Sequence, residues 1–487
     1  MAEVRAAEES LMRTVPPGAL MRRAAFGLAV HCVRLLRTPY GAPVSLLVGA
    51  GNNGGDALYA GAQLARRGVA VTALLLVPER AHTGGLAALR AAGGRAVPAG
   101  PGAERAVREA RLVLDGIVGI GGAGSLRPEA AALVAAAADG SATIVAVDVP
   151  SGIAADTGAV EGDAVTADIT VTFGCLKPGL LVGEGSERAG EVRLVDIGLL
   201  PHLPPPTILV LSDADVGTLL PVPGPRDDKY TRGVPGVAAG SSVYPGAAVL
   251  CTGAAVRGGA GMVRYAGGAA EYVRARWPEA IVTSGGPASA GQVQAWAVGP
   301  GMGTDDEADR ALRDVLAFDV PVLVDADGLT LLARAPGLVR DRSTPTVLTP
   351  HDREFERIAG PVGSDRIGAA RRAAADLGAV VLLKGSATVI ASPDGGAYVN
   401  PTGTPWLATA GSGDVLSGLG GSLLAAGLAP ALAAAVAAYV HGVAGSIAAG
   451  GATTSAGGVL DALPAALRAL ARPDGQRRVR PAGSASR

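Results

Sequence analysis

Three apolar runs in the first half of the 487-residue chain end in residues that could do chemistry. Val44–Val48 leads into the loop Asn52–Asp56, which reads Asn-Asn-Gly-Gly-Asp. Asp115 ends a second run and precedes the glycine-rich segment Gly119–Ser125, and Asp148 ends a third run. Because ligands of parallel α/β sheets bind at the carboxyl ends of the strands, these segments are predicted to share one crevice.

The loop Asn52–Asp56 combines two features. Glycines at a strand-to-helix turn let backbone N–H groups approach a phosphate, and the helix N-terminus attracts that anion. The interleaved amide and carboxylate oxygens suit a hard cation beside the phosphates. The alternative is a tight turn in which Asp56 caps the following helix, and Asp115 and Asp148 could each be a cap or turn residue.

In the second half, the segment Thr409–Asp414, Thr-Ala-Gly-Ser-Gly-Asp, opens a long uncharged helix. Small residues let several N–H groups point into one concavity, which makes an anion hole at a helix N-terminus. Asp414 would place a carboxylate beside a transferred phosphoryl group, where it could deprotonate a hydroxyl. The alternative is a glycine-rich helix start with Asp414 as a favourable N-terminal charge.

Further polar residues follow apolar runs in this half. Gly303 follows Val298–Gly301, His351 follows Leu348-Thr349-Pro350, and Lys384 opens the sequence Lys-Gly-Ser-Ala-Thr. His351 could instead be a capping or core histidine. The other four histidines receive no site role: His441, in an Ala-rich helix, is interpreted as a core residue, and His31, His82 and His202 as surface residues.

Lysine is scarce. Of the 42 basic residues only Lys177, Lys229 and Lys384 are lysines. The alternative explanation is a bias toward arginine across the whole sequence. Against that bias, a lysine that persists indicates a position that needs its compact ammonium group.

Composition limits the class of protein. Hydrophobic residues make up 49% and charged residues 17%, which indicates a globular chain, and the net charge of -1 gives no electrostatic footprint for nucleic acid. The three cysteines are far apart, which favours a reduced cytoplasm. Early acidic residues argue against a secretory signal.

The uncharged stretch Val415–Leu460 is interrupted by proline and glycines, so we expect two buried helices rather than a membrane span.

The elements that must position these residues alternate between strand and helix. Strands are predicted over residues 44–48, 69–77, 112–114 and 143–147, with helices over 56–67, 84–92 and 128–138. This repeated βαβ pattern predicts a doubly wound parallel sheet. A proline-rich linker is expected near residue 210, and a second α/β pattern follows it, with strands over 320–324, 346–348 and 380–383.

The first half resembles the NAD(P)H-hydrate epimerase family. The similarity rests on Asn52–Asp56, Asp115 with its glycine run, Val147–Gly152 and the opening Glu8-Glu9…Leu20–Ala25, although Ala57 stands where the family often has a further glycine. The resemblance implies a Rossmann-like sheet, potassium bound by Asn53, Asp115 and Ser151, and interconversion of the R and S hydrates. It further implies that the dinucleotide contacts Asn52, Asn53, Gly54, Gly55, Asp56, Gly119, Ile120, Gly121, Gly122, Ala123, Gly124, Ser125 and Asp148.

Within this resemblance Asp148 is the expected acid/base, because a carboxylate within reach of the C6 hydroxyl can shuttle its proton. Lys177 lies in Phe173–Gly179, a stretch that the family shares, but no role for it follows from the sequence. The alternative for Lys177 is a lysine in a surface loop.

The second half resembles the ribokinase-like superfamily in its Gly-x-Gly-Asp motif, where the aspartate activates the acceptor hydroxyl. With Lys229, the glycine-rich segment from Gly233 to Ala248, Val298–Gly303, the Thr-Pro-His segment and Lys384–Thr388, it resembles the NAD(P)H-hydrate dehydratase domain. That resemblance implies hydrate contacts by Ala247, Gly303, His351 and Asp414. It implies adenine-nucleotide contacts by Lys384, Gly385, Ser386, Ala387, Thr388 and Gly413.

The sequence therefore predicts an epimerase domain over residues 1–210, a ribokinase-like, ADP-dependent dehydratase domain over 211–475 and a disordered tail over 476–487. The expected activity is repair of hydrated NADH and NADPH, with Asp148 and Asp414 as the catalytic residues. Potassium is the expected cofactor and ADP the co-substrate, with Mg²⁺ as a further candidate. The alternative is a ribokinase-like small-molecule kinase fused to a non-catalytic dinucleotide-binding module. We expect a cytoplasmic homo-oligomer that binds neither nucleic acid nor membrane.

Overall fold

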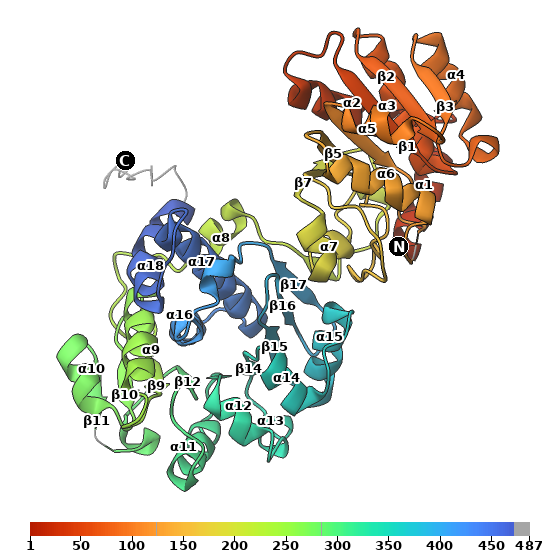
Figure 1. Ribbon diagram of the computed structural model, residues 1–487. Helices are drawn as coiled ribbons and strands as arrows, with labels where there is room; N and C mark the ends of the chain where they lie inside the picture. The colour runs from red at the N-terminus through yellow and green to blue at the C-terminus, as the bar shows by residue number, and fades with distance from the viewer. Residues whose placement is uncertain (123, 284, 472–487) are drawn as a thin grey trace, which may run out of the picture. The chain divides into compact units, whose positions relative to one another are not determined.

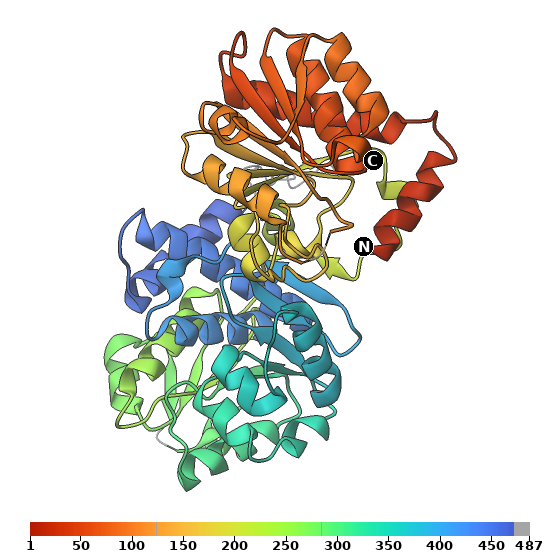
Figure 2. The ribbon, with the colours of Figure 1, turned by 45° about the vertical axis from the view of Figure 1, so that its right-hand side comes forward.

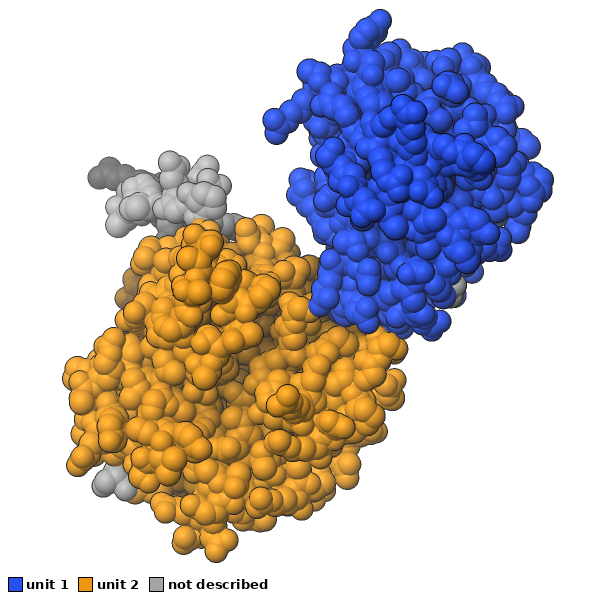
Figure 3. Space-filling view, in the orientation of Figure 1, with its two compact units in different colours: residues 1–206 blue, residues 207–487 orange. Residues whose placement is uncertain are grey.

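The computed structural model describes residues 1–122, 124–283 and 285–471, so Ala123 and the predicted tail over 476–487 lie outside the described residues. The chain forms two compact units, Met1–Pro206 and Thr207 onward (Figure 3). The sequence placed this boundary after residue 210. Residues 207–210 belong instead to the second unit, because the short strand β8 (Ile208–Leu209) pairs with the last strand of that unit's sheet.

The first unit is built on a seven-stranded sheet in the order β3-β2-β1-β4-β5-β6-β7, in which every neighbouring pair is parallel. The strand order reverses between β1 and β4, which is where doubly wound sheets bind ligands. The strands are β1 (Pro43–Val48), β2 (Ala70–Leu75), β3 (Arg95–Pro98), β4 (Leu112–Gly116), β5 (Thr143–Val147), β6 (Ile169–Phe173) and β7 (Glu191–Val195).

Helices cover both faces of this sheet, because alternate strand residues point to opposite sides. On β1, Leu46 packs with α1 to α4, whereas Leu47 packs with α5 and α6. The helices are α1 (Ala2–Met12), α2 (Ala19–Leu36), α3 (Asn52–Ala65), α4 (Thr83–Ala91), α5 (Ala103–Arg108), α6 (Pro128–Ala138) and α7 (Gly183–Arg188), with short 3₁₀ turns η1 (Pro78–Arg80), η2 (Pro178–Leu180) and η3 (Leu200–His202) (Figure 1).

The second unit contains a ten-stranded sheet in the order β11-β10-β9-β12-β13-β14-β15-β16-β17-β8. Its pairs are parallel except β15 with β16 and β16 with β17. Besides β8, the strands are β9 (Pro235–Ala238), β10 (Arg264–Ala266), β11 (Ile281–Thr283), β12 (Ala295–Val298), β13 (Val322–Val324), β14 (Thr346–Leu348), β15 (Val380–Leu383), β16 (Thr388–Ala391) and β17 (Ala397–Asn400).

The helices of the second unit also divide between the two faces. One core joins the sheet to α8, α9, α10, α16, α17 and α18, and another joins it to α11, α12 and α13. The bounds are α8 (Asp213–Leu219), α9 (Pro245–Arg257), α10 (Ala270–Arg276), α11 (Asp306–Leu316), α12 (Asp327–Leu332), α13 (Gly337–Arg340), α14 (Asp352–Ala359), α15 (Arg366–Leu377), α16 (Ser412–Ala425), α17 (Pro430–Ala449) and α18 (Ala456–Leu470), with η4 (Pro287–Ser289) and η5 (Pro405–Leu407).

The uncharged stretch forms the closely packed core helices of this unit, which are the blue helices gathered together in Figure 2. In α16 a side chain at Gly418 would lie 2.0 Å from the Cys251 carbonyl oxygen of α9, so glycine lets the two helices approach. Helix α17 alone among the described residues is long and apolar enough to cross a membrane, yet 67% of its most apolar window is buried. It therefore packs here as a core helix, as the sequence predicted.

Candidate active sites

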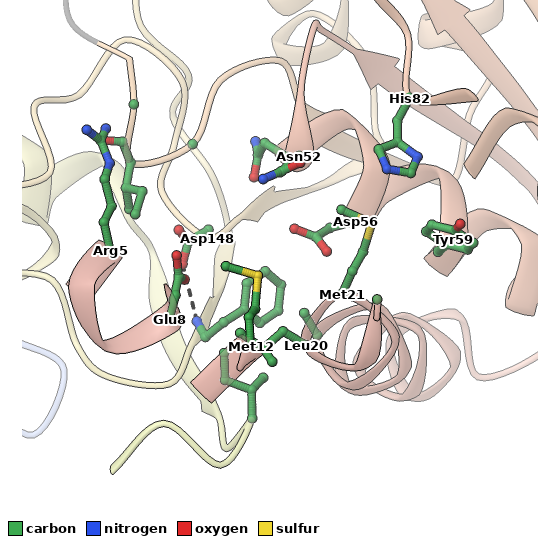
Figure 4. A pocket seen from close by; sticks show the side chains of 18 of the residues that line it. Arg5, Glu8, Met12, Leu20, Met21, Asn52, Asp56, Tyr59, His82 and Asp148 are labelled. Carbon is green, nitrogen blue, oxygen red and sulfur yellow. Dashed lines mark hydrogen bonds between the residues drawn. The ribbon is translucent and has the colours of Figure 1, made fainter. Parts of the chain in front are cut away.

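The first unit contains a cavity of about 740 Å³ at the carboxyl edge of its sheet (Figure 4). Its walls come from α1, α2, the first turns of α3 and the loops after β2, β4 and β5. This volume lies within the range of small-molecule sites. The polar side chains on its walls are Arg5, Glu8, Glu9, Arg22, Asn52, Asn53, Asp56, Tyr59, His82 and Asp148.

The sequence predicted that the Asn-Asn-Gly-Gly-Asp segment is a loop before the helix. The segment instead forms the first turn of α3. Gly54 is required there because a side chain would lie 2.5 Å from the Gly49 carbonyl oxygen. Asn52, Asn53 and Asp56 line the cavity, whereas Gly54 and Gly55 are buried beneath it. The first turn of α3 therefore forms part of the cavity wall.

The glycine-rich segment is divided. Gly119, Ile120 and Gly121 line the cavity, and the Arg5 guanidinium donates to the Ile120 carbonyl at 3.3 Å. Gly122 and Gly124 continue the loop on either side of residue 123. Ser125 makes a different contact. Its Oγ accepts a hydrogen bond from the Asp163 N–H at 3.0 Å.

The three predicted potassium ligands converge beside this loop. Asp115 is fully buried and accepts hydrogen bonds from the Ser151 hydroxyl at 2.6 Å and the Ser151 N–H at 2.8 Å. The amide of Asn53 lies between the Val147 carbonyl oxygen and the Gly119 N–H, at 3.0 and 3.3 Å. Burial raises the pKa of Asp115 to about 6, although the hydrogen bonds from Ser151 lower it.

Asp148 and Lys177 form an ion pair at the cavity wall. The Lys177 Nζ lies 2.6 Å from Asp148 Oδ1 and also donates to Thr172 Oγ1 and the Phe173 carbonyl, at 2.9 and 2.7 Å. Its side chain is 1% exposed, so the interpretation of Lys177 as a surface lysine is wrong. Asp148 adopts a left-handed backbone conformation, with φ of 69°, which is uncommon for a residue other than glycine and typical of functional sites.

Two further carboxylates face the same cavity, Glu8 from α1 and Asp56 from α3 (Figure 4). Asp56 Oδ1 is buried, and no described residue donates a hydrogen bond to it. Burial raises the pKa of Asp56 well above its usual value, and the carboxylates of Asp148 and Glu8 add to this shift. Burial and Asp148 likewise raise the pKa of Glu8. With Glu9 and Asp148, four acidic side chains thus line the cavity, and the buried Lys177 pairs with one of them, Asp148.

The second unit places a comparable cluster at the ends of β13 and β15. The Lys384 Nζ lies 2.8 Å from Asp325 Oδ1, and Asp325 Oδ2 accepts a hydrogen bond from Ser417 Oγ at 2.7 Å. Burial raises the pKa of Asp414 to about 7, and the Asp325 carboxylate adds to this shift, although Lys384 opposes it. A side chain at Gly413 would lie 3.5 Å from both Asp325 Oδ2 and Lys384 Nζ, so Gly413 sits at the centre of this cluster.

Burial lowers the pKa of Lys384, but the attraction of Asp325 and Glu354 outweighs burial and raises that pKa overall. Glu354 Oε2 lies 3.7 Å from Lys384 Nζ and accepts a hydrogen bond from the His351 N–H at 2.8 Å. His351 caps α14, because its Nδ1 accepts from the N–H groups of Arg353 and Glu354. The capping alternative therefore describes His351, whose half-exposed ring can still contact a ligand.

Helix α16 begins at Ser412, as the Gly-Ser-Gly-Asp pattern predicted. The Ser412 hydroxyl and carbonyl lie 3.1 and 3.0 Å from His441 Nε2, which comes from α17. His441 is buried, and burial lowers its pKa to about 4, so the ring is neutral near pH 7. The prediction of a hydrogen-bonded core histidine is confirmed, with the addition that this histidine contacts Ser412 at the start of α16.

The remaining predicted contacts of this unit lie at neighbouring strand ends. Gly303 donates its N–H to Asp327 Oδ2 at 2.9 Å, and the Ala247 side chain lies against Gly301. In the segment Lys384–Thr388, Gly385 packs against the Arg366 guanidinium, and Ser386 lies in the turn before β16. Ala387 and Thr388 bury their side chains at the start of that strand, so only their backbone groups could reach a nucleotide.

Two family models match the chain. Residues 17–179 match a family described as YjeF-related protein N-terminus, and residues 236–463 match one described as NAD(P)H-hydrate dehydratase. Among curated proteins, the "bifunctional NAD(P)H-hydrate repair enzyme Nnr" of Mycobacterium leprae is 53% identical over 480 residues, which cover 96% of this chain and 99% of the relative. The protein of the same name from Mycobacterium tuberculosis is 56% identical and covers 89% of this chain and 90% of the relative. The chain belongs to the family of bifunctional NAD(P)H-hydrate repair enzymes.

Solved structures resemble the second half of this repair enzyme. A ribokinase-like superfamily protein from Enterococcus faecalis superposes with a TM-score of 0.50 and 26% identity, over 56% of this chain and 99% of that one. An ADP/ATP-dependent NAD(P)H-hydrate dehydratase from Bacillus subtilis is 30% identical over 53% of this chain and 97% of that one, with a TM-score of 0.47. The predicted α/β class with a ribokinase-like second half is confirmed.

For several residues at these sites, the sequence did not predict a site role. His82, interpreted as a surface residue, lines the cavity and caps α4 through Nδ1, which accepts the Gly85 N–H at 3.0 Å. Asp325 and Glu354, which hold Lys384, were also missed. Asp325 comes directly after a predicted strand, as Asp115 and Asp148 nearly do, so the same strand-end rule could have found it.

Proposed function

We propose that the first unit interconverts the R and S hydrates of NADH and NADPH, and that the second unit dehydrates the S hydrate with ADP as co-substrate. One observation carries the proposal. A single chain that aligns nearly end to end with bifunctional repair enzymes contains two carboxylate–lysine sites, each at the carboxyl edge of its own sheet. A simple kinase would need only the second site.

In the first unit, the side chains on the cavity wall suit a dinucleotide. The N–H groups at the start of α3 and the Arg5 and Arg22 guanidinium groups offer donors to the pyrophosphate. Asp148, which forms an ion pair with Lys177, is the acid/base at the C6 hydroxyl. The pocket walls include Asn52, Asn53, Asp56, Gly119, Ile120 and Gly121, which are the predicted contacts that we propose bind the dinucleotide.

Potassium fits the group formed by Asn53, Asp115 and Ser151. These side chains offer only oxygen as a ligand for a cation, which is the donor type that hard cations prefer. The buried Asp115 carboxylate, whose pKa is raised by burial, would gain from a nearby positive charge. A bound cation there would fix the loop that carries Gly119 and so shape the adjacent substrate wall. Asp115→Ala should weaken potassium binding and slow epimerisation, and an epimerase rate indifferent to potassium in both proteins would refute this assignment.

In the second unit, Asp414 is proposed to remove the proton of the C6 hydroxyl. The hydroxyl oxygen then bonds to the terminal phosphorus of ADP, and AMP leaves with the electron pair of the broken P–O bond. Phosphate is a good leaving group, so it departs from C6 with its electron pair while a proton leaves C5, and the double bond of the reduced ring returns. The N–H groups at the start of α16 would stabilise the transferred phosphoryl group.

The residues proposed around this chemistry have distinct roles. Ala247, Gly303 and His351 would contact the hydrate, whereas Lys384, Gly385, Ser386 and Gly413, with the backbone of Ala387 and Thr388, would contact the nucleotide. Mg²⁺ stays a candidate that would arrive with the nucleotide phosphates, because Lys384 already pairs with Asp325 and lies near Glu354. Within the described ranges, no three His, Cys, Asp or Glu side chains are arranged to bind a metal ion.

The decisive experiment incubates hydrated NADH with the protein and ADP, and follows the return of the near-ultraviolet absorbance of the reduced ring. With an equal mixture of the R and S hydrates, complete conversion requires both activities, whereas conversion that stops at half requires only the second. No conversion, with ADP consumed on another alcohol, would favour the kinase alternative. A cytoplasmic homo-oligomer remains a prediction, which light scattering and cell fractionation would test.

A further inference from the structure

Asp148 and Asp56 face one cavity but have opposite hydrogen-bond environments (Figure 4). Asp148 Oδ1 accepts hydrogen bonds from Lys177 Nζ, Thr172 Oγ1 and the Phe173 N–H, at 2.6, 3.0 and 3.2 Å. Asp56 Oδ1 is buried, and no donor among the described residues reaches it. The two carboxyl groups therefore differ in what stabilises a negative charge.

This difference bears on how easily each group holds a negative charge. Asp148 is paired with Lys177 and accepts two further hydrogen bonds. A buried carboxylate without donors is costly, which favours its protonated form. At Asp56 burial raises the pKa most, the carboxylates of Asp148 and Glu8 add to this shift, and Lys177 opposes it. One cavity thus contains an ion-paired carboxylate and a buried carboxyl group whose pKa is raised.

We propose that Asp56 is a catalytic residue of the epimerase, the proton donor that works together with ionised Asp148. This inference rests on the proposed function of the first unit and deepens it. Asp56 was expected only to contact the dinucleotide. Two carboxyl groups that share a site in different protonation states are the arrangement that acid–base chemistry at one carbon requires.

In the proposed step, the Asp56 carboxyl gives its proton to the C6 hydroxyl, and the C6–O bond breaks with its electron pair on the departing water. The lone pair of N1 forms a double bond to C6, and the negative charge of Asp148 stabilises the resulting cation. Water then adds to the other face of C6, its lone pair forms the new C6–O bond, and its proton passes to Asp148. The opposite epimer results, and proton exchange with solvent restores the starting state.

The surroundings of Asp56 support a donor rather than a binding role. Arg5 and Arg22 line the same cavity and provide the positive charges that phosphate groups need. The carboxyl group of Asp56 is not needed for that purpose. His82 and Tyr59 also line this side of the cavity and are the neighbours whose protonation must be considered in a pH profile. Glu8, whose pKa burial and the Asp148 carboxylate raise, is the competing proton donor.

The test uses the full-length protein with potassium present and compares Asp56→Asn, Glu8→Gln and the exposed control Glu79→Gln. Epimer exchange is measured by chromatography, hydrate affinity by fluorescence titration, and dehydration of pure S hydrate confirms folding of the second unit. Asp56→Asn should lower the epimerisation kcat by about 10²–10⁴-fold, the usual contribution of a general acid. Its affinity for the hydrate should change by less than about threefold, because asparagine keeps the size and a hydrogen-bond donor. Glu79→Gln should match the native protein.

Other results would contradict the proposal at a particular point. A large loss of hydrate affinity with kcat preserved would make Asp56 a binding residue and overturn the proposal. A kcat loss in Glu8→Gln alone would assign the donor role to Glu8. Epimerisation in ¹⁸O-labelled water should place one label on C6 for each inversion, and retention of the original oxygen would exclude the water-loss step. If the native protein does not epimerise at all, the proposed function of this unit fails before any variant is compared.

Discussion

Each unit contains one buried lysine–aspartate pair, and the two pairs face opposite ways. In the first unit, Lys177 is 1% exposed and Asp148 is 13% exposed, so the carboxylate is nearer to the cavity. In the second unit, Asp325 is 2% exposed and Lys384 is 21% exposed, so the ammonium group is nearer to the surface. Two of the three lysines of the chain are used in this way.

The reversal distinguishes the proposed roles of the two partners. In the first unit, the lysine lies behind the carboxylate, which suits a carboxylate that accepts protons or stabilises a cation. In the second unit, the aspartate lies behind the lysine, which suits an ammonium group proposed to meet the nucleotide phosphates. The proposed base there is a third residue, Asp414, whose pKa burial raises to about 7.

The largest expected effect separates the two sites. Asp414→Ala should lower the rate of dehydration by about 10²–10⁴-fold, because the proposed base for the hydroxyl proton is lost. Epimer interconversion should stay nearly intact, because the first unit has its own sheet and its own lysine–aspartate pair. Both rates are measured on the same preparation. Loss of both activities in a folded variant would mean that the sites are shared.

The next effect concerns the pair of the first unit. Lys177→Met leaves a partly buried carboxylate without its cation, which should destabilise that unit by about 3–5 kcal/mol. Urea unfolding measures this loss, with the exposed Lys229→Met, expected to stay within about 0.5 kcal/mol, as the control. Equal, small effects of the two changes would show that the ion pair does not stabilise the unit.

The pH profiles of the two activities should have opposite slopes. Dehydration needs ionised Asp414, whose pKa burial raises to about 7, so its kcat should fall about tenfold per pH unit below that value. Epimerisation needs protonated Asp56, whose pKa burial raises, so its kcat should fall on the alkaline side. Lys384→Met removes the positive charge that lowers the pKa of Asp414 and should move the dehydration midpoint to higher pH. Parallel profiles for the two activities would contradict the assignment.

The smallest expected effect concerns the identity of the cation. Lys384→Arg keeps the charge but replaces a compact ammonium with a wide planar group beside Asp325 and Glu354. We expect the KM for ADP to rise on the order of tenfold, and the KM for the hydrate to rise less. If Lys384 only supports the fold, both constants should stay unchanged while the melting temperature falls. Steady-state kinetics and calorimetry of this variant separate the two roles.

Most strand ends of the first unit could be predicted from the sequence, because a buried parallel strand is a short apolar run and a polar residue marks its end. Asp115 and Asp148 were located in this way. Strands β3, β6 and β7 were not predicted, and in the edge strand β7 charged Glu191 and Arg193 interrupt the apolar pattern. The start of α3 was placed at Asp56 rather than Asn52, because glycine and asparagine are poor helix formers and their role in the first turn depends on the approach of Gly49.

The amino-acid sequence by itself determined the two α/β halves, the strand-end aspartates and the glycine-rich start of α16, since these depend on local patterns of apolar residues, glycines and caps. It also indicated that the persisting lysines were special, but not why. Only the tertiary structure decided the partners, because Lys177 meets Asp148 and Lys384 meets Asp325 across 29 and 59 residues of chain. The same holds for Asp56 and Asp148, which are the same residue type. Other elements bring donors to Asp148, whereas Asp56 Oδ1 is buried with no donor among the described residues.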